Sequence, residues 1–229
     1  MSQLPFLILD CYYDEIGAAP NFRALLEGAP STTVRLVREP APVDLSGYRG
    51  ILITGSRANI PDPEPWMEGL FELVHRAQQL EVPLLGICFG HQAIAAAIGG
   101  PGAVRTAPRG ELGWNKIEVG RATPILAGLD KSFTCFVSHF DEVSPDTEGL
   151  EVFASSQDCA VQGFQVRGQR TWGLQFHPEM DPLESETLVR SNASRHRGLE
   201  QGVAELMAER IDGRDLGAII FRNFAELCH

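Results

Sequence analysis

Short apolar runs alternate with helical patterns through the first hundred residues. Three runs are apolar at nearly every position, at residues 6–10, 50–54 and 82–87, and residues 32–37 are rich in β-branched side chains, so all four segments predict strands. Helical patterns lie between and after them, at residues 21–27, 65–80 and 91–98. Strands that are apolar throughout are covered on both faces, so this alternation predicts an α/β fold with a parallel, doubly wound sheet.

The pattern changes after residue 110. Strands follow at close spacing with few helical runs between them, at residues 114–119, 133–137, 151–155, 161–166 and 171–176. We therefore expect antiparallel strands and hairpins to extend the parallel sheet. From residue 183 the pattern is helical again, with a break at Asp212-Gly213. A single domain over 1–229 is expected, with a core of about 6–181 and a C-terminal helical extension over 183–229.

Charge and cysteine content narrow the class of protein. Nineteen Lys and Arg against thirty Asp and Glu give a net charge of −11, which disfavours nucleic acid and anionic membranes as partners. The first apolar run is too short for a signal peptide or membrane span. The five cysteines are scattered without a C-x-x-C pair, so neither a disulfide framework nor a zinc ribbon is expected. These features indicate a cytoplasmic protein.

Cys88 stands where an apolar strand runs directly into a helix. Its surroundings, Gly86-Ile87-Cys88-Phe89-Gly90, have the glycine–nucleophile–glycine layout in which a tight turn presents one side chain above the sheet edge. The positive end of the following helix favours the reactive thiolate, and the Phe89 N–H is placed to donate to an oxyanion. The alternative is a small buried cysteine that only packs between strand and helix.

A candidate base and its partner follow another predicted strand. His177 precedes Pro178, which favours extended backbone, so His177 and Glu179 project to the same side. A carboxylate beside an imidazole fixes its tautomer and stabilises its charged form. The alternatives are a solvated strand-end turn and a metal pair, but no third ligand lies nearby in sequence, so no metal site is predicted. Ligands in open α/β sheets bind at the carboxyl ends of strands, where both motifs stand.

Residues 86–92 and 175–179 together resemble the class I (triad-type) glutamine amidotransferases. More narrowly, the sequence is similar to the glutaminase domain of GMP synthetase and its stand-alone relatives, over about residues 6–181. The resemblance implies a flavodoxin-like mixed sheet in which Cys88 is the nucleophile, His177 the general base and acid, and Glu179 the orienting carboxylate. It also implies an oxyanion hole from the N–H groups of Gly55 and Phe89. Substrate contacts are implied for Gln92 and for the S-H-x-D segment, through Ser138, His139 and Phe140.

The implied reaction converts glutamine to glutamate and ammonia through a γ-glutamyl thioester on Cys88. No cofactor is implied, and the ammonia goes to an acceptor or to a synthetase partner in trans. The chain departs from the synthetase pattern where Gly55-Ser56-Arg57 replaces a double glycine before proline. It also carries neither an S-G-G-x-D-S phosphate loop nor anything else that resembles an ATP or acceptor site.

Two other functions remain open from the sequence. The same triad serves a hydrolase of γ-glutamyl peptides or conjugates, and a protein that kept only the fold would be a non-catalytic regulatory module. The segment with Arg105, Arg109 and residues 111–114 is interpreted as a solvated or partner-facing loop. His139 and Asp141 are interpreted as a structural turn, with His139 meeting substrate through its backbone only. The arginine-bearing tail is expected either to cover the sheet or to dock a partner.

Overall fold

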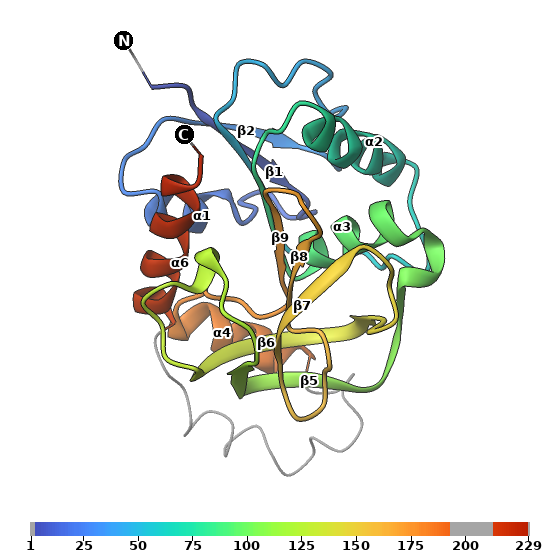
Figure 1. Ribbon diagram of the computed structural model, residues 1–229, viewed down its shortest axis with the longest axis vertical. Coiled ribbons are helices and arrows are strands. Elements are labelled where there is room, and N and C mark those ends of the chain that lie inside the picture. The colour runs from blue at the N-terminus through green and yellow to red at the C-terminus, as the bar shows by residue number, and fades with distance from the viewer. Residues whose placement is uncertain (1–2, 193–212, 229) are drawn as a thin grey trace.

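The computed structural model describes residues 3–192 and 213–228 and is built on one nine-stranded sheet (Figure 1). The strand order is β2-β1-β3-β4-β9-β8-β7-β5-β6. The parallel strands are β1 (Phe6–Asp10), β2 (Ser31–Arg35), β3 (Gly50–Ile53), β4 (Leu84–Ile87) and β9 (Thr171–Leu174). The antiparallel strands are β5 (Val104–Val119), β6 (Ser132–Val143), β7 (Leu150–Ser155) and β8 (Gly163–Val166). The predicted doubly wound mixed sheet is therefore confirmed.

The described helices are α1 (Ala19–Leu25), α2 (Trp66–Gln79), α3 (Phe89–Gly99), α4 (Pro182–Asn192) and α6 (Arg214–Glu226). Helices α1 and α6 cover one face of the parallel half and α2 and α3 the other, whereas α4 packs against the antiparallel strands β5 and β6 (Figure 1). Along β1, Phe6 and Ile8 belong to the cluster that α1 and α6 cover, whereas Leu7 and Leu9 belong to the cluster that α2 and α3 cover. Alternate side chains thus enter different cores, which explains why the strand is apolar at every position.

Proline fixes the starts of two helices. Pro65 is the N-terminal cap of α2, so the helix predicted over 65–80 is present with nearly the same bounds. Helix α1 begins two residues earlier than its prediction over 21–27, because Pro20 occupies the first turn instead of preceding it. Proline is well tolerated there, since the first N–H groups of a helix have no intrahelical partner.

The loop predicted before residue 114 is wrong, because β5 already begins at Val104. It pairs with β6 from Val104 to Glu118, with a register irregularity between Thr106 and Glu111. Strand β6 in turn continues to Val143, so that the S-H-x-D segment lies within a strand instead of at its end. Buried polar residues in both strands broke the apolar pattern on which the prediction depended.

Helices were predicted from residue 183 onward, and both described parts of this region contain one. Helices α4 and α6 lie within the predicted extension, and α6 begins directly after Gly213. The predicted helical positions Leu199, Val203, Leu206 and Met207, and the arginines Arg195, Arg197 and Arg210, lie outside the described residues. Across residues 3–192 and 213–228, no helix is both long and apolar enough to cross a membrane. All five cysteines are free thiols.

Candidate active site

Cys88 occupies a strained turn between β4 and α3. Its backbone dihedrals, φ 53° and ψ −103°, lie where non-glycine residues are rarely found. The glycines on either side permit this turn by letting backbones approach. A Cβ atom on Gly86 would lie 2.4 Å from the carbonyl of Gly90, and one on Gly90 would lie 2.6 Å from the carbonyl oxygen of Ile53. The turn from β4 into α3 therefore has no room for a side chain at residue 86 or at residue 90.

Adjacent strands deliver Cys88 and His177 to the same edge of the sheet. Strands β4 and β9 are parallel neighbours, and the Cys88 N–H donates to the Leu174 carbonyl at 2.7 Å. The N–H of His177 donates to the Phe136 carbonyl of β6 at 2.8 Å, which fixes the backbone of the residue. The Cys88 thiol lies 3.8 Å from the carbonyl oxygen of Ser138. The order of strands in the sheet brings together residues that are far apart in sequence.

His177 and Glu179 form a buried pair. Nδ1 of His177 lies 2.7 Å from Oε1 of Glu179, as expected for side chains two residues apart on extended backbone. Burial lowers the pKa of His177, but the charges of Glu179 and Cys88 and its hydrogen bonds to both raise it, and the net shift is well above the ordinary value. The charged imidazolium is therefore favoured beside the Glu179 carboxylate.

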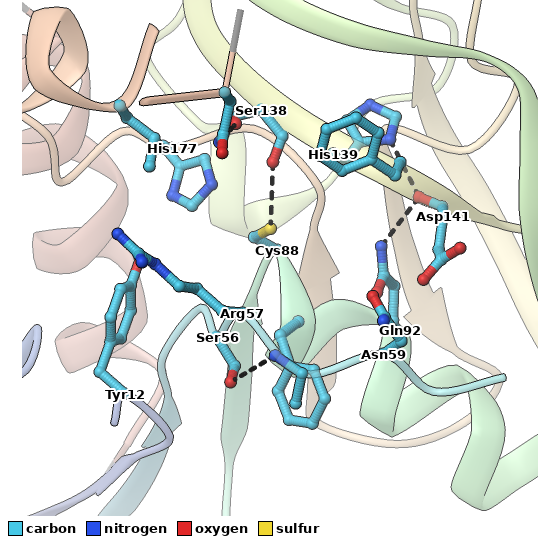
Figure 2. Close-up of a pocket in the computed structure, with 15 residues that line it drawn as sticks. Tyr12, Ser56, Arg57, Asn59, Cys88, Gln92, Ser138, His139, Asp141 and His177 are labelled. Carbon is cyan, nitrogen blue, oxygen red and sulfur yellow. Dashed lines mark hydrogen bonds between the residues drawn. The ribbon is translucent and has the colours of Figure 1, made fainter. Parts of the chain in front are cut away.

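A pocket opens beside this group (Figure 2). Cys88 and His177 line it, together with residues that follow β1 and β3 and residues of α3, β6 and α4. Gln92 of α3 is held by two acceptors, since its Nε2 donates to the Asp141 carbonyl at 2.9 Å and to Oε1 of Gln175 at 3.0 Å. The predicted substrate contacts Gln92, Ser138, His139 and Phe140 thus all border the pocket that contains Cys88.

Of the predicted oxyanion-hole residues, Phe89 directly follows Cys88 and Gly55 lies beside His177. Phe89 is the first residue of α3, where backbone N–H groups lack intrahelical partners. Gly55 follows β3, and a Cβ atom on it would lie 3.3 Å from both Cε1 of His177 and the Tyr12 hydroxyl. Glycine at this position therefore leaves the space beside the imidazole open.

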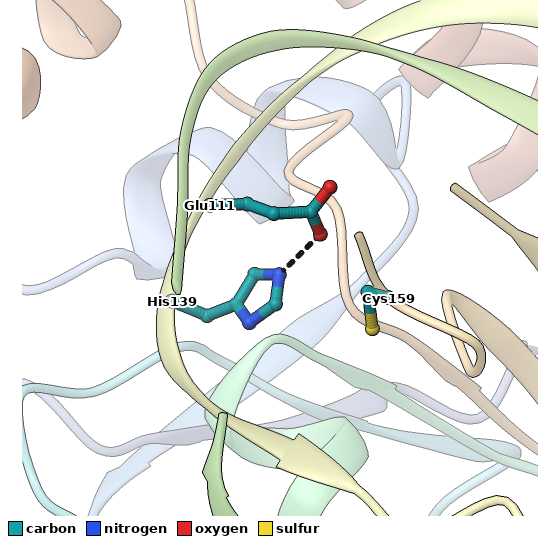
Figure 3. Close-up of side chains that lie close together, drawn as sticks. All are labelled: Glu111, His139 and Cys159. Carbon is teal, nitrogen blue, oxygen red and sulfur yellow. Dashed lines mark hydrogen bonds and ion pairs between the residues drawn. The ribbon is translucent and has the colours of Figure 1, made fainter. Parts of the chain in front are cut away.

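A second buried histidine–carboxylate pair joins β6, whose residues line the pocket, to β5 (Figure 3). Nε2 of His139 lies 2.8 Å from Oε2 of Glu111, and its Nδ1 lies 2.9 Å from the Asp141 carbonyl oxygen. Burial raises the pKa of Glu111, but hydrogen bonds from His139, Ser156 and Asn115 lower it, and the net shift is downward.

Cys159 lies close enough to this pair for the three ligand atoms to fall within 4.8 Å of one another. Such a set has the composition of a metal site. However, both oxygens of Glu111 already accept hydrogen bonds, from Asn115 and Ser156 on one and from His139 and Gln162 on the other. The cluster is therefore explained as a satisfied polar network. Glu111 belongs to this interior, which corrects its interpretation as part of a solvated loop.

The structure also places residues in the pocket that were not predicted from sequence. Tyr12 and Arg57 follow the parallel strands β1 and β3, and Leu188 and Asn192 come from α4. Asn192 donates from Nδ2 to the Ser138 hydroxyl at 3.1 Å. The rule that ligands bind at the carboxyl ends of parallel strands was the signal that could have identified Tyr12 and Arg57. No comparable signal marks the two residues of α4.

The mixed sheet and the pocket at Cys88 together describe a class of protein, and a family model identifies that class. The family model for glutamine amidotransferase class-I matches residues 16–194, which is most of the chain. The chain therefore belongs to the class I glutamine amidotransferase family.

Several relatives are GMP synthases by name. The chain is 36% identical over 152 residues to the glutamine-hydrolyzing GMP synthase of Porphyromonas gingivalis, covering 66% of this chain and 29% of that protein. It is 38% identical over 112 residues to a protein of Methanococcus vannielii that is named as one subunit of glutamine-hydrolyzing GMP synthase, covering 49% of this chain and 58% of that one. The chain thus matches less than two thirds of the length of either relative.

Solved structures share the fold along nearly the whole chain. A crystal structure described as that of a putative GMP synthase subunit from Thermoplasma acidophilum has a TM-score of 0.71 at 25% identity, covering 100% of this chain and 95% of that one. A glutamine amidotransferase from Methylobacillus flagellatus has a TM-score of 0.77 at 22% identity, covering 98% and 95%. The second likeness concerns the fold alone.

Proposed function

We propose that this chain hydrolyses the side-chain amide of glutamine to glutamate and ammonia. The observation that carries the proposal is that Cys88, on its strained turn, and His177, whose ring is paired with the buried Glu179, line one pocket. An amide nitrogen is a poor leaving group, so its displacement requires a nucleophile, a proton donor and stabilisation of the oxyanion. Family membership and the names of the relatives support glutamine as the source of that amide.

In the first half of the reaction the Cys88 thiolate attacks the side-chain carbonyl carbon of glutamine. The carbonyl oxygen takes up the negative charge and receives hydrogen bonds from the N–H groups of Phe89 and Gly55. The His177 imidazolium gives its proton to the amide nitrogen, the C–N bond breaks, and ammonia leaves. A γ-glutamyl thioester remains on Cys88.

In the second half of the reaction, water displaces Cys88 from the thioester. Neutral His177 takes a proton from the water, whose oxygen attacks the thioester carbonyl, and the Cys88 thiolate departs as the C–S bond breaks. Glutamate is released and the imidazolium is restored beside Glu179, whose carboxylate holds Nδ1 protonated throughout. The amino-acid end of the substrate lies toward Gln92 and the main chain of Ser138, His139 and Phe140, which border the same pocket. These steps use only the chain's own residues and water.

The ammonia is proposed to reach a separate synthetase in the cytoplasm. A partner in trans is favoured because one relative is named as a subunit of GMP synthase, which implies a further subunit in that protein. Neither nucleic acid nor a membrane has a role in the proposal, in keeping with the net charge of −11.

Glutamate release from purified protein tests the function. The unaltered chain should release glutamate from glutamine, and Cys88→Ser and His177→Gln should each lower kcat at least about a hundredfold. His75→Gln, at an exposed position of α2, is the matched histidine control and should retain activity. Circular dichroism verifies that each variant is folded. Equal glutamate release from the unaltered chain and Cys88→Ser would end the proposal.

A further inference from the structure

Tyr12 lies in the pocket but has no part in the steps described so far. It follows β1, lines the pocket together with Cys88 and His177, and packs against one of the two cores. Its backbone is held on both sides, because its N–H donates to Oδ1 of Asp10 at 3.0 Å and its carbonyl accepts from Nη2 of Arg35 at 2.9 Å. The phenol is therefore presented to the pocket from a fixed segment.

The hydroxyl of Tyr12 and the imidazole of His177 border the same space. The hydroxyl oxygen and Cε1 of His177 each lie 3.3 Å from the position that a Cβ atom on Gly55 would occupy. Figure 2 shows both side chains on one side of the pocket and Gln92 on the other. The phenol therefore lies beside the proposed base and away from the residues proposed to hold the amino-acid end of the substrate.

Tyr12 keeps its proton at neutral pH. Burial raises its pKa, and electrostatic interactions with Glu179 and Cys88 raise it further, to well above the ordinary value. A phenol in this state is not the base, which leaves proton transfer to His177. Its oxygen can still accept a hydrogen bond while its O–H donates another, so it can orient a small polar molecule.

The water of the second half of the reaction needs more orientation than the nitrogen of the first half. Before the C–N bond breaks, the amide nitrogen is held by its covalent bond to the substrate, whereas the attacking water is held by hydrogen bonds alone. His177 binds one hydrogen of that water as it takes the proton. A second contact on the same side would direct the oxygen lone pair toward the thioester carbonyl.

We propose that the Tyr12 hydroxyl is a further catalytic group, which accepts the second hydrogen of the attacking water and orients the water toward the thioester. The inference rests on the proposed function, since it needs the γ-glutamyl thioester on Cys88. The water oxygen bonds to the thioester carbonyl carbon, one proton passes to His177, and the C–S bond breaks as the thiolate leaves. The second hydrogen stays on the new carboxyl group, which loses it to solvent on release.

The test measures how the thioester divides between water and hydroxylamine. Hydroxylamine attacks through its nitrogen, gives a proton to His177 and yields γ-glutamyl hydroxamate. It is a much stronger nucleophile than water and therefore depends less on orientation. With glutamine and a fixed hydroxylamine concentration, the ratio of hydroxamate to glutamate should rise about tenfold in Tyr12→Phe, the size expected for loss of one hydrogen bond. The γ-glutamyl adduct on Cys88, measured by intact-protein mass spectrometry after acid quenching, should increase as well.

Tyr13→Phe is the matched control. Tyr13 is the next residue in the chain, is exposed, and donates from its hydroxyl to Glu64. It is not among the described residues that line the pocket. Removing its hydroxyl should leave both kcat and the product ratio unchanged. Circular dichroism verifies that the two variants are folded.

Each failure has a distinct meaning. An unchanged product ratio in Tyr12→Phe overturns the inference even where kcat falls, because slower thioester formation or a disturbed fold leaves the division of the thioester unaltered. An equal rise in Tyr13→Phe also overturns it, since the effect would not belong to the hydroxyl in the pocket. In both cases glutamate release by the unaltered chain leaves the proposed function intact. Absence of glutamate release from the unaltered chain contradicts the proposed function and the inference with it.

Discussion

Cys88 shows how one residue is held in a conformation that its own side chain disfavours. The bonds from its N–H to Leu174 and from the Gln92 N–H to its carbonyl fix the turn on both sides. Such strain costs about 1–3 kcal/mol and persists only where the surroundings impose it. The fold therefore holds the proposed nucleophile at a positive φ, a backbone conformation that a cysteine by itself disfavours.

Removing the side chain at this position should reveal the strain. Cys88→Gly should be more stable than Cys88→Ala by about 1 kcal/mol, because relief of strain exceeds the entropic cost of glycine. Urea denaturation of the two variants measures the difference. Ala95→Gly, a buried position within α3, is the control and should lower stability. Equal stability of Cys88→Gly and Cys88→Ala would contradict the claim of strain.

Alkylation should single out the same residue. Burial raises the pKa of the Cys11 and Cys135 thiols far above the ordinary value, and raises the pKa of Cys159 and Cys228 to about 12. Cys88 alone among the five lines the pocket and begins a helix. Iodoacetamide at neutral pH should therefore modify Cys88 first, as read by peptide mass spectrometry, and glutamine should slow the modification. Labelling of Cys11 or Cys135 at the same rate would favour a non-catalytic module.

Among the helices, α6 packs directly against the segment that carries the proposed base. A Cβ atom on Gly217 would lie 2.3 Å from the carbonyl oxygen of Pro178, between His177 and Glu179 in sequence. The helix also brings Phe221 against Phe22 of α1, with ring centroids 5.3 Å apart. Helix α6 therefore supports the segment that carries His177 and Glu179 while completing one of the two cores.

Gly217→Ala tests this support. The added methyl has no space, so α6 or the Pro178 segment must shift, which should lower stability by about 1–3 kcal/mol and reduce kcat for glutamate release about tenfold. The matched control is Gly69→Ala, at a helix glycine of α2 whose nearest side chain would be 3.6 Å away. That variant should be neutral or slightly stabilising. Loss of kcat in both variants to the same extent would show that the effect is not specific to α6.

The strands and helices differ in how well the sequence predicts them. Strand β1 and helix α2 were predicted with almost the observed bounds, because their apolar positions alone define them. Strand β5 was missed over half its length because Glu111 is buried against His139, a partner on another strand. In the sequence, a buried polar residue that hydrogen-bonds to a distant partner cannot be told apart from a polar residue exposed to solvent.

At the scale of the whole molecule, the site stands where the sheet changes from parallel to antiparallel. Strand β9 pairs in parallel with β4 and antiparallel with β8, and the proposed base follows it. The two motifs were recognisable in sequence, and their convergence followed from the expected sheet. Tyr12 and Arg57 could not be assigned to the pocket in the same way, because their place depends on how separate loops meet at the sheet edge.

The charge of His177 should make stability depend on alkaline pH. Its pKa is raised in the folded chain, so its contribution is full below the unfolded value of about 6.5 and is lost as pH rises through the folded value. The free energy of unfolding of the unaltered chain, relative to His177→Gln, should therefore be larger at pH 6 than at pH 9. Urea denaturation at both values measures it. A difference between the two proteins that stays constant with pH would contradict the raised pKa.

The packing of α6 on Pro178 has a consequence for a chain still being made. A ribosome exposes Cys88 well before the helix that holds the His177 segment in place. If the proposed function is correct, we therefore expect a nascent chain to hydrolyse glutamine only after residues 214–226 have left the exit tunnel and α6 has packed on Pro178.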